Sequence, residues 1–296
     1  MRKNYLASLC LILWAIPLLL QAEWHPILPS SEEPAPKVFA RLEGGLILVE
    51  ATLNGQVGNY ILDTGASHLF INKKNITQVR SHAVGLGAGT PIDELTIAFF
   101  QLGSTTFTNQ TVYQMDMTHL ERIKGCKIDG IIGMDMLQEF KLYVNYAKGI
   151  ISLQSSIDNT LSTELISKVI PLTYQQHFPM VIVTVDQQTY NFAIDTGAEA
   201  NLFFDNYEKT IKKVVKNKKA TRVWGIGNTA MVMKKIELTQ LHCFDQIYYN
   251  QEFMFANLAA LNQSYDVSLD GVLGFPFLKN QTFTLDFKKG EMRIWE

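Results

Sequence analysis

Two copies of the triplet Asp-Thr-Gly carry the most specific chemical signal in this 296-residue sequence. The first begins at Asp63 and the second at Asp195, 132 positions later, and each has two apolar residues before it and an alanine after it. One chance copy of such a triplet is expected in roughly one chain in twenty of this length. Two copies in matched contexts indicate a duplicated site.

Asp63 and Asp195 have the side chains needed for acid–base chemistry if the chain brings them together. Two carboxyl groups a few ångström apart cannot both ionise, so they share one proton. The ionised partner can take a proton from a water molecule while the protonated partner donates to a carbonyl oxygen. Such a pair can hydrolyse an amide without a covalent intermediate.

The residues that follow each aspartate are suited to holding two loops close to each other. Gly65 and Gly197 allow a sharp backbone turn and leave room for a second lobe to approach. Thr64 and Thr196 have short hydroxyl groups, which we expect to bond locally to the backbone and to fix each loop.

The chain before each triplet predicts a β-hairpin. Apolar residues alternate over 49–53 and over 181–185, which is the period of a strand. Asn54-Gly55 follows the first run and is a strong turn signal, because both central residues need positive φ. Asp186-Gln187 follows the second run, so each half begins with a hairpin whose second strand leads into Asp-Thr-Gly.

A second match, at an offset of 141 residues, extends the similarity toward the end of each half. Residues 128–137 align with residues 269–278, and the match continues into tails that predict two short strands around a Lys-Gly turn. Each aligned stretch contains an apolar-apolar-Gly segment that we expect to pack against an aspartate loop. Asp129 and Asp270 precede these segments, and we interpret them as structural caps of backbone amides.

Many short strands with little helix predict an all-β fold of two similar barrel-like lobes. The basic start, the apolar run from Leu6 to Leu20 and the small residue that follows are typical of a signal peptide and predict a secreted or periplasmic protein. The run has 15 residues, fewer than the ~20 of a spanning helix, and an N-terminal membrane anchor remains the alternative. We expect a signal peptide at 1–22, an extended lead-in at 23–36, an N-terminal lobe at 37–153, a linker at 154–168 and a C-terminal lobe at 169–296.

The charge of the chain gives no reason to expect a nucleic-acid partner, because the formal net charge is only −2. One basic stretch, residues 207–219, places Ile211, Val214 and Val215 at helical spacing. This spacing predicts a solvated helix, with an anionic binding surface as the alternative.

Histidine and cysteine residues show no spacing that suggests a metal site, so we expect no metal and no cofactor. The six histidines are scattered along the chain. Cys126 and Cys243 remain if the signal segment is removed. Export would permit a disulfide between them, and the sequence leaves their pairing open.

These motifs resemble those of the retropepsin-like and pepsin-like aspartic proteases over about residues 45–153 and 178–295. The resemblance rests on Ile-Leu-Asp63-Thr-Gly-Ala, on Ala-Ile-Asp195-Thr-Gly-Ala and on the two apolar-apolar-Gly segments. Viral members of that family dimerise to unite two aspartates, whereas pepsin-like members carry both in one chain. This chain resembles the fused form, as a tandem repeat of two retropepsin-like lobes, and the resemblance implies pseudo-twofold symmetry between the lobes and an interlobe cleft. The resemblance implies an aspartic endopeptidase acting on a peptide or protein substrate, with Asp63 and Asp195 as its catalytic residues.

The family also has a glycine-rich flap between the aspartate loop and the apolar-Gly strand. The candidates here are Gly85 and Gly87 in the first half and Gly225 and Gly227 in the second. Trp224 is the aromatic residue that we expect to touch substrate. Ordinary turns, and a buried core tryptophan, are the alternative interpretations of these residues.

Two other functional hypotheses remain open. The chain could be a non-catalytic peptide-binding module that kept the fold, although the presence of both complete triplets favours catalysis. The site could also form only in a dimer. A linker of about 15 residues can reach between adjacent lobes, so we expect a monomer with an intramolecular pair and, once the signal peptide is removed, no membrane span.

Overall fold

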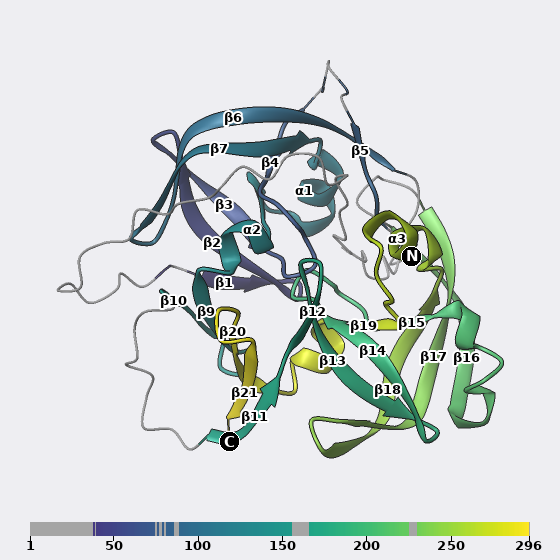
Figure 1. The fold of residues 1–296 in the computed structure, drawn as a ribbon. Coiled ribbons are helices and arrows are strands. Elements are labelled where there is room, and N and C mark those ends of the chain that lie inside the picture. The colour runs from purple at the N-terminus through teal and green to yellow at the C-terminus, as the bar shows by residue number, and fades with distance from the viewer. Residues whose placement is uncertain are drawn as a thin grey trace.

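The computed structural model describes residues 38, 40–74, 76, 79, 81–85, 89–155, 166–224 and 230–295. These ranges fold mainly into strands, which form two eight-stranded sheets and one five-stranded sheet (Figure 1). The predicted signal peptide and lead-in lie outside the described residues. Residues 156–165 of the predicted linker also lie outside them, and the two ends of that linker belong to strands.

The first eight-stranded sheet forms the N-terminal lobe and has the strand order β1-β2-β3-β8-β4-β7-β6-β5. Its strands are β1 (Ala40–Glu43), β2 (Leu46–Leu53), β3 (Gln56–Leu62), β4 (Phe70–Asn72), β5 (Ser81–Ala83), β6 (Thr90–Leu102), β7 (Thr105–Met115) and β8 (Gly130–Ile132). Strands β3 and β8 run parallel, with Ile61 opposite Ile131. This pairing brings the apolar-apolar-Gly segment beside the strand that leads into Asp63.

The second eight-stranded sheet forms the C-terminal lobe and has the order β12-β13-β14-β19-β15-β18-β17-β16, so its strands follow the same sequence of positions. They are β12 (Thr173–Gln175), β13 (Phe178–Val185), β14 (Gln188–Ile194), β15 (Leu202–Phe204), β16 (Val215–Trp224), β17 (Ala230–Cys243), β18 (Gln246–Ala256) and β19 (Gly271–Leu273). Strands β14 and β19 run parallel, with Ala193 opposite Val272, as β3 and β8 do.

The five-stranded sheet joins the two lobes and has the order β10-β9-β20-β21-β11 (Figure 1). Its strands are β9 (Phe140–Asn145), β10 (Ile150–Ser155), β11 (Ile166–Pro171), β20 (Thr282–Asp286) and β21 (Glu291–Trp295). The two tails meet in the middle, where β9 pairs with β20 and Leu142 lies opposite Leu285. Lys141 and Asp286 form a buried ion pair across this junction, with 3.7 Å between Nζ and Oδ2.

The helices are short and lie at the ends of the strands. They are α1 (Thr118–Lys124), α2 (Met134–Leu137), α3 (Ala259–Tyr265), α4 (Phe275–Leu278) and the 3-10 turns η1 (Asp205–Tyr207) and η2 (Lys212–Val214). None of the helices in the described ranges is long and apolar enough to cross a membrane. The prediction of a helix over residues 207–219 is wrong, because two 3-10 turns are followed by the edge strand β16.

Both predicted hairpin turns are confirmed. The φ angles are +47° at Asn54 and +87° at Gly55, and they are +48° at Asp186 and +65° at Gln187. All four values lie in the left-handed region that a two-residue turn between antiparallel strands needs. Each hairpin therefore delivers its second strand, β3 or β14, directly to an Asp-Thr-Gly loop.

Buried apolar side chains connect the two lobes and pack beneath both aspartate loops. The largest cluster of buried apolar side chains runs from one lobe to the other through the five-stranded sheet, where Leu142, Val144 and Leu285 are fully buried. Two smaller clusters lie under the aspartate loops, one containing Ala66 and the other containing Ala198. Each loop is thus packed on an apolar base.

Candidate active site

Asp63 and Asp195 lie directly after β3 and β14, where the two lobes meet. The backbone N–H of Asp63 donates to Ile132 O at 3.1 Å, and that of Asp195 donates to Leu273 O at 3.0 Å. The last residue of each short parallel strand therefore holds the start of an aspartate loop. This is the packing that the apolar-apolar-Gly segments predicted.

The two threonines tie the loops to each other. Thr64 Oγ1 donates to Ile194 O at 2.7 Å, and Thr196 Oγ1 donates to Leu62 O at 2.9 Å. In return, the N–H of Thr196 donates to Thr64 Oγ1 at 3.0 Å and that of Thr64 donates to Thr196 Oγ1 at 3.2 Å. The prediction of local bonds is wrong, because every one of these bonds crosses between the lobes. Buried polar groups need partners, and here each lobe supplies the partners of the other.

Each aspartate faces the glycine of the opposite loop. A Cβ atom added to Gly65 would lie 2.6 Å from Asp195 Oδ2, and one added to Gly197 would collide with the Asp63 carboxyl group. The structure thus brings together Asp63 and Asp195, and it confirms that the glycines leave space for the other lobe.

The two carboxyl groups are completely buried. Asp63 Oδ1 accepts hydrogen bonds from the N–H groups of Gly65 (2.8 Å) and Ala66 (3.1 Å), and Asp195 Oδ1 accepts one from Gly197 (2.8 Å). The Oδ2 atoms of both aspartates have no donor among the described residues while both groups are ionised. One proton shared between them supplies that donor.

The electrostatics agree with a shared proton. Burial raises the pKa of Asp63 well above its usual value, and the charge of Asp195 raises it further against the hydrogen bonds from backbone amides. Burial also raises the pKa of Asp195, to about 7, although its hydrogen bonds with Asp63 and backbone amides lower it. Burial therefore favours a state in which the pair holds one shared proton.

Asp129 and Asp270 have structural contacts, as interpreted from the sequence. Asp129 Oδ2 accepts the N–H of Asn59 at 2.8 Å, and Asp270 Oδ2 accepts the N–H of Asn191 at 2.8 Å. Tyr207 also donates its hydroxyl to Asp270 Oδ1 at 2.5 Å. These bonds fix the start of β8 and β19 and do not involve the dyad.

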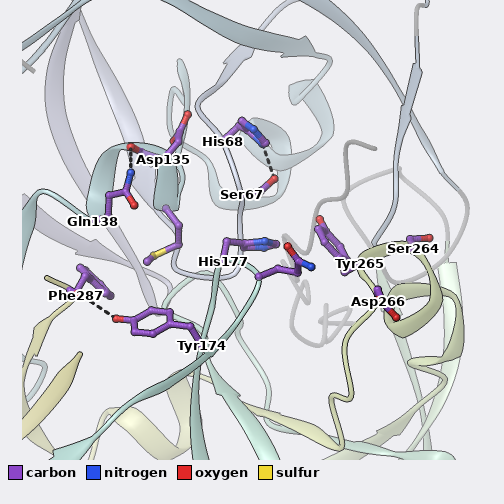
Figure 2. A pocket seen from close by; sticks show the side chains of 12 residues that line it. Ser67, His68, Asp135, Gln138, Tyr174, His177, Ser264, Tyr265, Asp266 and Phe287 are labelled. Atoms are coloured by element: carbon purple, nitrogen blue, oxygen red, sulfur yellow. Dashed lines mark hydrogen bonds between the residues drawn. The ribbon is translucent and has the colours of Figure 1, made fainter. Parts of the chain in front are cut away.

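A cavity of about 840 Å³ lies between the lobes, next to the loop that follows Asp63 (Figure 2). Neither aspartate lines this cavity. Its lining comes from both lobes: Ser67, His68, Met134, Asp135, Gln138, Tyr174, Gln176, His177, Ser264, Tyr265, Asp266 and Phe287.

His177 connects the cavity to the loop of the dyad. Its Nε2 lies 3.1 Å from Gly65 O, so Nε2 carries the proton and donates to this carbonyl. Burial lowers the pKa of His177 to about 3 and that of His68 to about 4, so both rings are neutral near pH 7. The His177 ring also packs on Phe178, with centroids 3.9 Å apart.

Tyr265 approaches the dyad from the C-terminal lobe. Its ring centroid lies 4.9 Å from that of His177. Burial raises the pKa of Tyr265 well above its usual value, while Ser67 lowers it and the negative charge of Asp63 raises it. Sequence reasoning missed Tyr265, His177 and Ser67. Aligning the two halves at offsets of 132 and 141 residues would have drawn attention to them, because their counterparts differ in chemical type.

The flap candidates lie mainly outside the described residues, as Gly87, Gly225 and Gly227 do. Gly85 lies in the connection between β5 and β6, and Trp224 is the last residue of β16. These positions are near the tips of two hairpins, and a role in substrate binding stays a prediction.

The two cysteines that the structure describes, Cys126 and Cys243, are free. Cys126 is half-buried and Cys243 is buried, and burial raises the pKa of the Cys243 thiol to about 12. Among the side chains that the structure describes, no three His, Cys, Asp or Glu residues come together where a metal ion could bind.

Comparison with known families agrees with the geometry. The family model described as aspartyl protease matches residues 49–136, a range that holds the first Asp-Thr-Gly loop and the first apolar-apolar-Gly segment. This match supports the retropepsin-like aspartyl protease family for the chain, and with it a protease of the hydrolase class. The second triplet lies outside the matched range. A search of curated proteins found no match.

Proposed function

We propose that this protein is an aspartic endopeptidase in which Asp63 and Asp195 form one catalytic dyad. The observation that carries the proposal is the interlocking of the two loops, in which each carboxyl group packs against the glycine of the opposite loop. A buried pair of carboxyl groups sharing one proton is suited to hydrolysis by an activated water. Aspartic-protease dyads are the established example of this effect.

The proposed mechanism assigns one role to each carboxyl group. The ionised carboxyl group of the pair takes a proton from a water molecule held between the two groups. The protonated carboxyl group donates its proton to the carbonyl oxygen of the scissile peptide bond. The backbone amides of Gly65 and Gly197 hold the other carboxyl oxygens in place, so the two groups need little rearrangement during the reaction.

Access to the dyad requires motion, because neither carboxyl group is exposed. Ser67 and His177 line the cavity, and His177 also donates a hydrogen bond to Gly65 O in the loop that follows Asp63. The cavity therefore lies next to the dyad loop. We propose that a peptide enters at this cavity.

We further propose that the site is complete within one chain, which is a tandem repeat of two retropepsin-like lobes. The same order of strands in both eight-stranded sheets supports the repeat. The four threonine hydrogen bonds and the shared five-stranded sheet support a dyad formed within a monomer.

We also propose, from the N-terminal sequence, that the protein is exported. Residues 1–22 would direct the protein to the secretory pathway and leave a secreted or periplasmic enzyme. N-terminal sequencing of the protein recovered from its host would begin near Glu23. A protein that keeps Met1 and sediments with membranes would instead have an anchor.

Cleavage of an unstructured protein such as casein tests the proposed activity. Wild type, Asp63→Asn and Asp195→Asn would be compared from pH 3 to pH 9, with and without a statine-type inhibitor. We expect each substitution to abolish cleavage while the variants remain folded by circular dichroism. Equal cleavage by all three proteins would refute the proposal, and binding of the inhibitor without any cleavage would favour a peptide-binding module.

A further inference from the structure

His177 contacts the loop of Asp63 from the opposite lobe. It lies in the turn between β12 and β13, and its Nε2 atom donates to Gly65 O at 3.1 Å, across 112 positions of the chain. A carbonyl oxygen can only accept a hydrogen bond, so the proton of the neutral ring is on Nε2. This bond ties a turn of the C-terminal lobe to the aspartate loop of the N-terminal lobe.

The bond ends on the peptide unit that also holds Asp63. The carbonyl group of Gly65 and the N–H group of Ala66 belong to one planar peptide unit. The Ala66 N–H donates to Asp63 Oδ1 at 3.1 Å and also lies 3.3 Å from Asp63 O, so both of its acceptors belong to Asp63. A chain of hydrogen bonds therefore runs from the His177 ring through this peptide unit to Asp63, and the bonds of such a chain polarise one another.

Two aromatic side chains hold the His177 ring in place. Its centroid lies 3.9 Å from that of Phe178 and 4.9 Å from that of Tyr265, which lines the same cavity (Figure 2). Phe178 and Tyr265 are buried and contact each other edge to face, with centroids 5.2 Å apart. The donor to Gly65 O is thus fixed in position before a substrate binds.

The His177 ring is uncharged over most of the pH range. Burial lowers the pKa of His177 to about 3, and the charge of His68 lowers it further, while the bond to Gly65 O raises it. Burial also raises the pKa of Asp135 to about 7 against hydrogen bonds from backbone amides. The other titratable groups that line the cavity with His177, His68 and Asp135 are Tyr174, Tyr265 and Asp266. Above about pH 4 the ring therefore acts on Gly65 O as a neutral donor.

The first lobe has no equivalent of this side chain. At the offset of the two triplets His177 corresponds to Gly45, in the turn between β1 and β2, and the hairpin registers repeat at this offset. Glycine has no side chain with which to donate to the second aspartate loop. A Cβ added to Gly45 would lie 2.8 Å from the ring of Phe275, which fills this space instead. The duplication of the lobes therefore does not account for His177.

We propose that His177 is a positioning residue of the dyad, which fixes Asp63 through the peptide unit between Gly65 and Ala66. This role rests on the proposed peptidase function. The donor holds Gly65 O and keeps the Ala66 N–H directed at Asp63 Oδ1. That N–H favours the ionised carboxyl group and lowers its pKa, so loss of the His177 donor raises the apparent pKa of the pair that shares the proton.

Two replacements of His177 separate the donor from the shape of the ring. His177→Phe keeps an aromatic ring against Phe178 and Tyr265 and removes the donor, whereas His177→Gln keeps an N–H donor. For His177→Phe we expect kcat to fall about tenfold with KM within about twofold of wild type, and the acid limb of the pH profile to rise by about half a unit. His177→Gln should stay near wild type in both. The control is His242→Phe, at an exposed position of β17, which should match wild type.

The protonation of the dyad can also be measured without cleavage. NMR of isotope-labelled aspartate side chains, assigned with Asp63→Asn and Asp195→Asn, gives the apparent pKa of the pair in each His177 variant. We expect the same rise of about half a unit in His177→Phe and recovery in His177→Gln. A histidine that only supports the fold would change the stability and leave both the acid limb and this pKa in place.

The two measurements separate the role of His177 from the proposed activity. An unchanged acid limb and an unchanged pKa in folded His177→Phe would overturn the positioning role and leave the peptidase intact, and so would a failure of His177→Gln to restore them. A raised pKa in a protein that cleaves no peptide would retain the positioning role and refute the peptidase.

Wild type supplies an independent test, and His177→Leu takes the place of His177→Phe if the latter fails to fold. The NMR signals of the ring nitrogens should show a neutral His177 ring protonated at Nε2 from pH 5 to pH 8. A ring protonated at Nδ1, or a charged ring in this range, would overturn the positioning role without any variant.

Discussion

Replacing Asp195 by asparagine should stabilise the protein at neutral pH while it removes the proposed activity. Burial raises the pKa of Asp195 to about 7 in the folded protein, whereas an aspartate in an unfolded chain titrates near ~3.9. Between these values the folded protein holds a proton that the unfolded chain has released. This contribution to stability is therefore complete at low pH and is lost as the pH rises to about 7.

The magnitude follows from the size of the pKa shift. A rise of about three units at ~1.4 kcal/mol per unit corresponds to ~4 kcal/mol. Asparagine cannot ionise, and its side-chain oxygen can still accept the N–H of Gly197, which lies 2.8 Å from Asp195 Oδ1. The free energy of unfolding of Asp195→Asn, relative to wild type, should therefore increase by up to ~4 kcal/mol between pH 4 and pH 8.

Urea unfolding at pH 4, 6 and 8, followed by tryptophan fluorescence, measures this difference. Asp186→Asn is the matched control, because Asp186 is exposed in a hairpin turn with φ of +48°, which asparagine tolerates. The control should differ from wild type by the same small amount at every pH. A pH-independent difference for Asp195→Asn would refute the reasoning that burial holds the proton on the dyad.

Three further predictions concern the dyad and its loops. The acid limb of the pH profile of kcat/KM should lie near pH 7 and not near pH 4, because one carboxyl group of the dyad must be ionised to act as a base and burial raises the pKa of Asp195 to about 7. A limb near pH 4, measured on a peptide substrate, would contradict the buried dyad. Thr196→Val should lower the free energy of unfolding by ~1–3 kcal/mol, because Leu62 O loses a buried donor, whereas Thr196→Ser should stay near wild type in urea unfolding. Gly197→Ala should lower kcat/KM at least about 100-fold by displacing the Asp63 carboxyl group, and unchanged cleavage would show that the loops are not interlocked.

The parts of the fold that depend on local sequence could be predicted. The turn at Asn54-Gly55 needs positive φ at both positions, and the residue types alone indicate this. The strands with alternating apolar residues and the tails follow from short-range patterns in the same way. The sequence also predicted that Asp129 and Asp270 accept backbone amides, although these amides lie 70 and 79 positions away. Internal similarity then placed the two aspartate loops at corresponding positions of two lobes.

The parts that depend on contacts between the lobes could not be predicted. Thr64 and Thr196 were expected to bond within their own loops, but their hydroxyls bond to the opposite loop, 130 or more residues away. The helical spacing of Ile211 and Val214 was misleading, because the chain instead joins the edge of a sheet through β16. Pairing with β17 outweighs such weak local propensity.

The contacts that His177 and Lys124 make with the aspartate loops also needed the structure. His177 was one of six scattered histidines in the sequence, and its bond to Gly65 joins residues 112 positions apart. Lys124 and Glu199 are separated by 75 positions. Only their positions in space show that Lys124 pairs with Glu199 of the second aspartate loop and that His177 lines a cavity next to the first.

Mixing two inactive variants tests the central claim most directly, because it asks whether both aspartates act within one chain. Cleavage of casein would be measured for Asp63→Asn, for Asp195→Asn and for an equimolar mixture refolded together. The account predicts that each variant and the mixture lack activity, because no chain then holds a complete dyad. Activity in either variant alone, or activity restored in the mixture, would contradict a single intramolecular dyad.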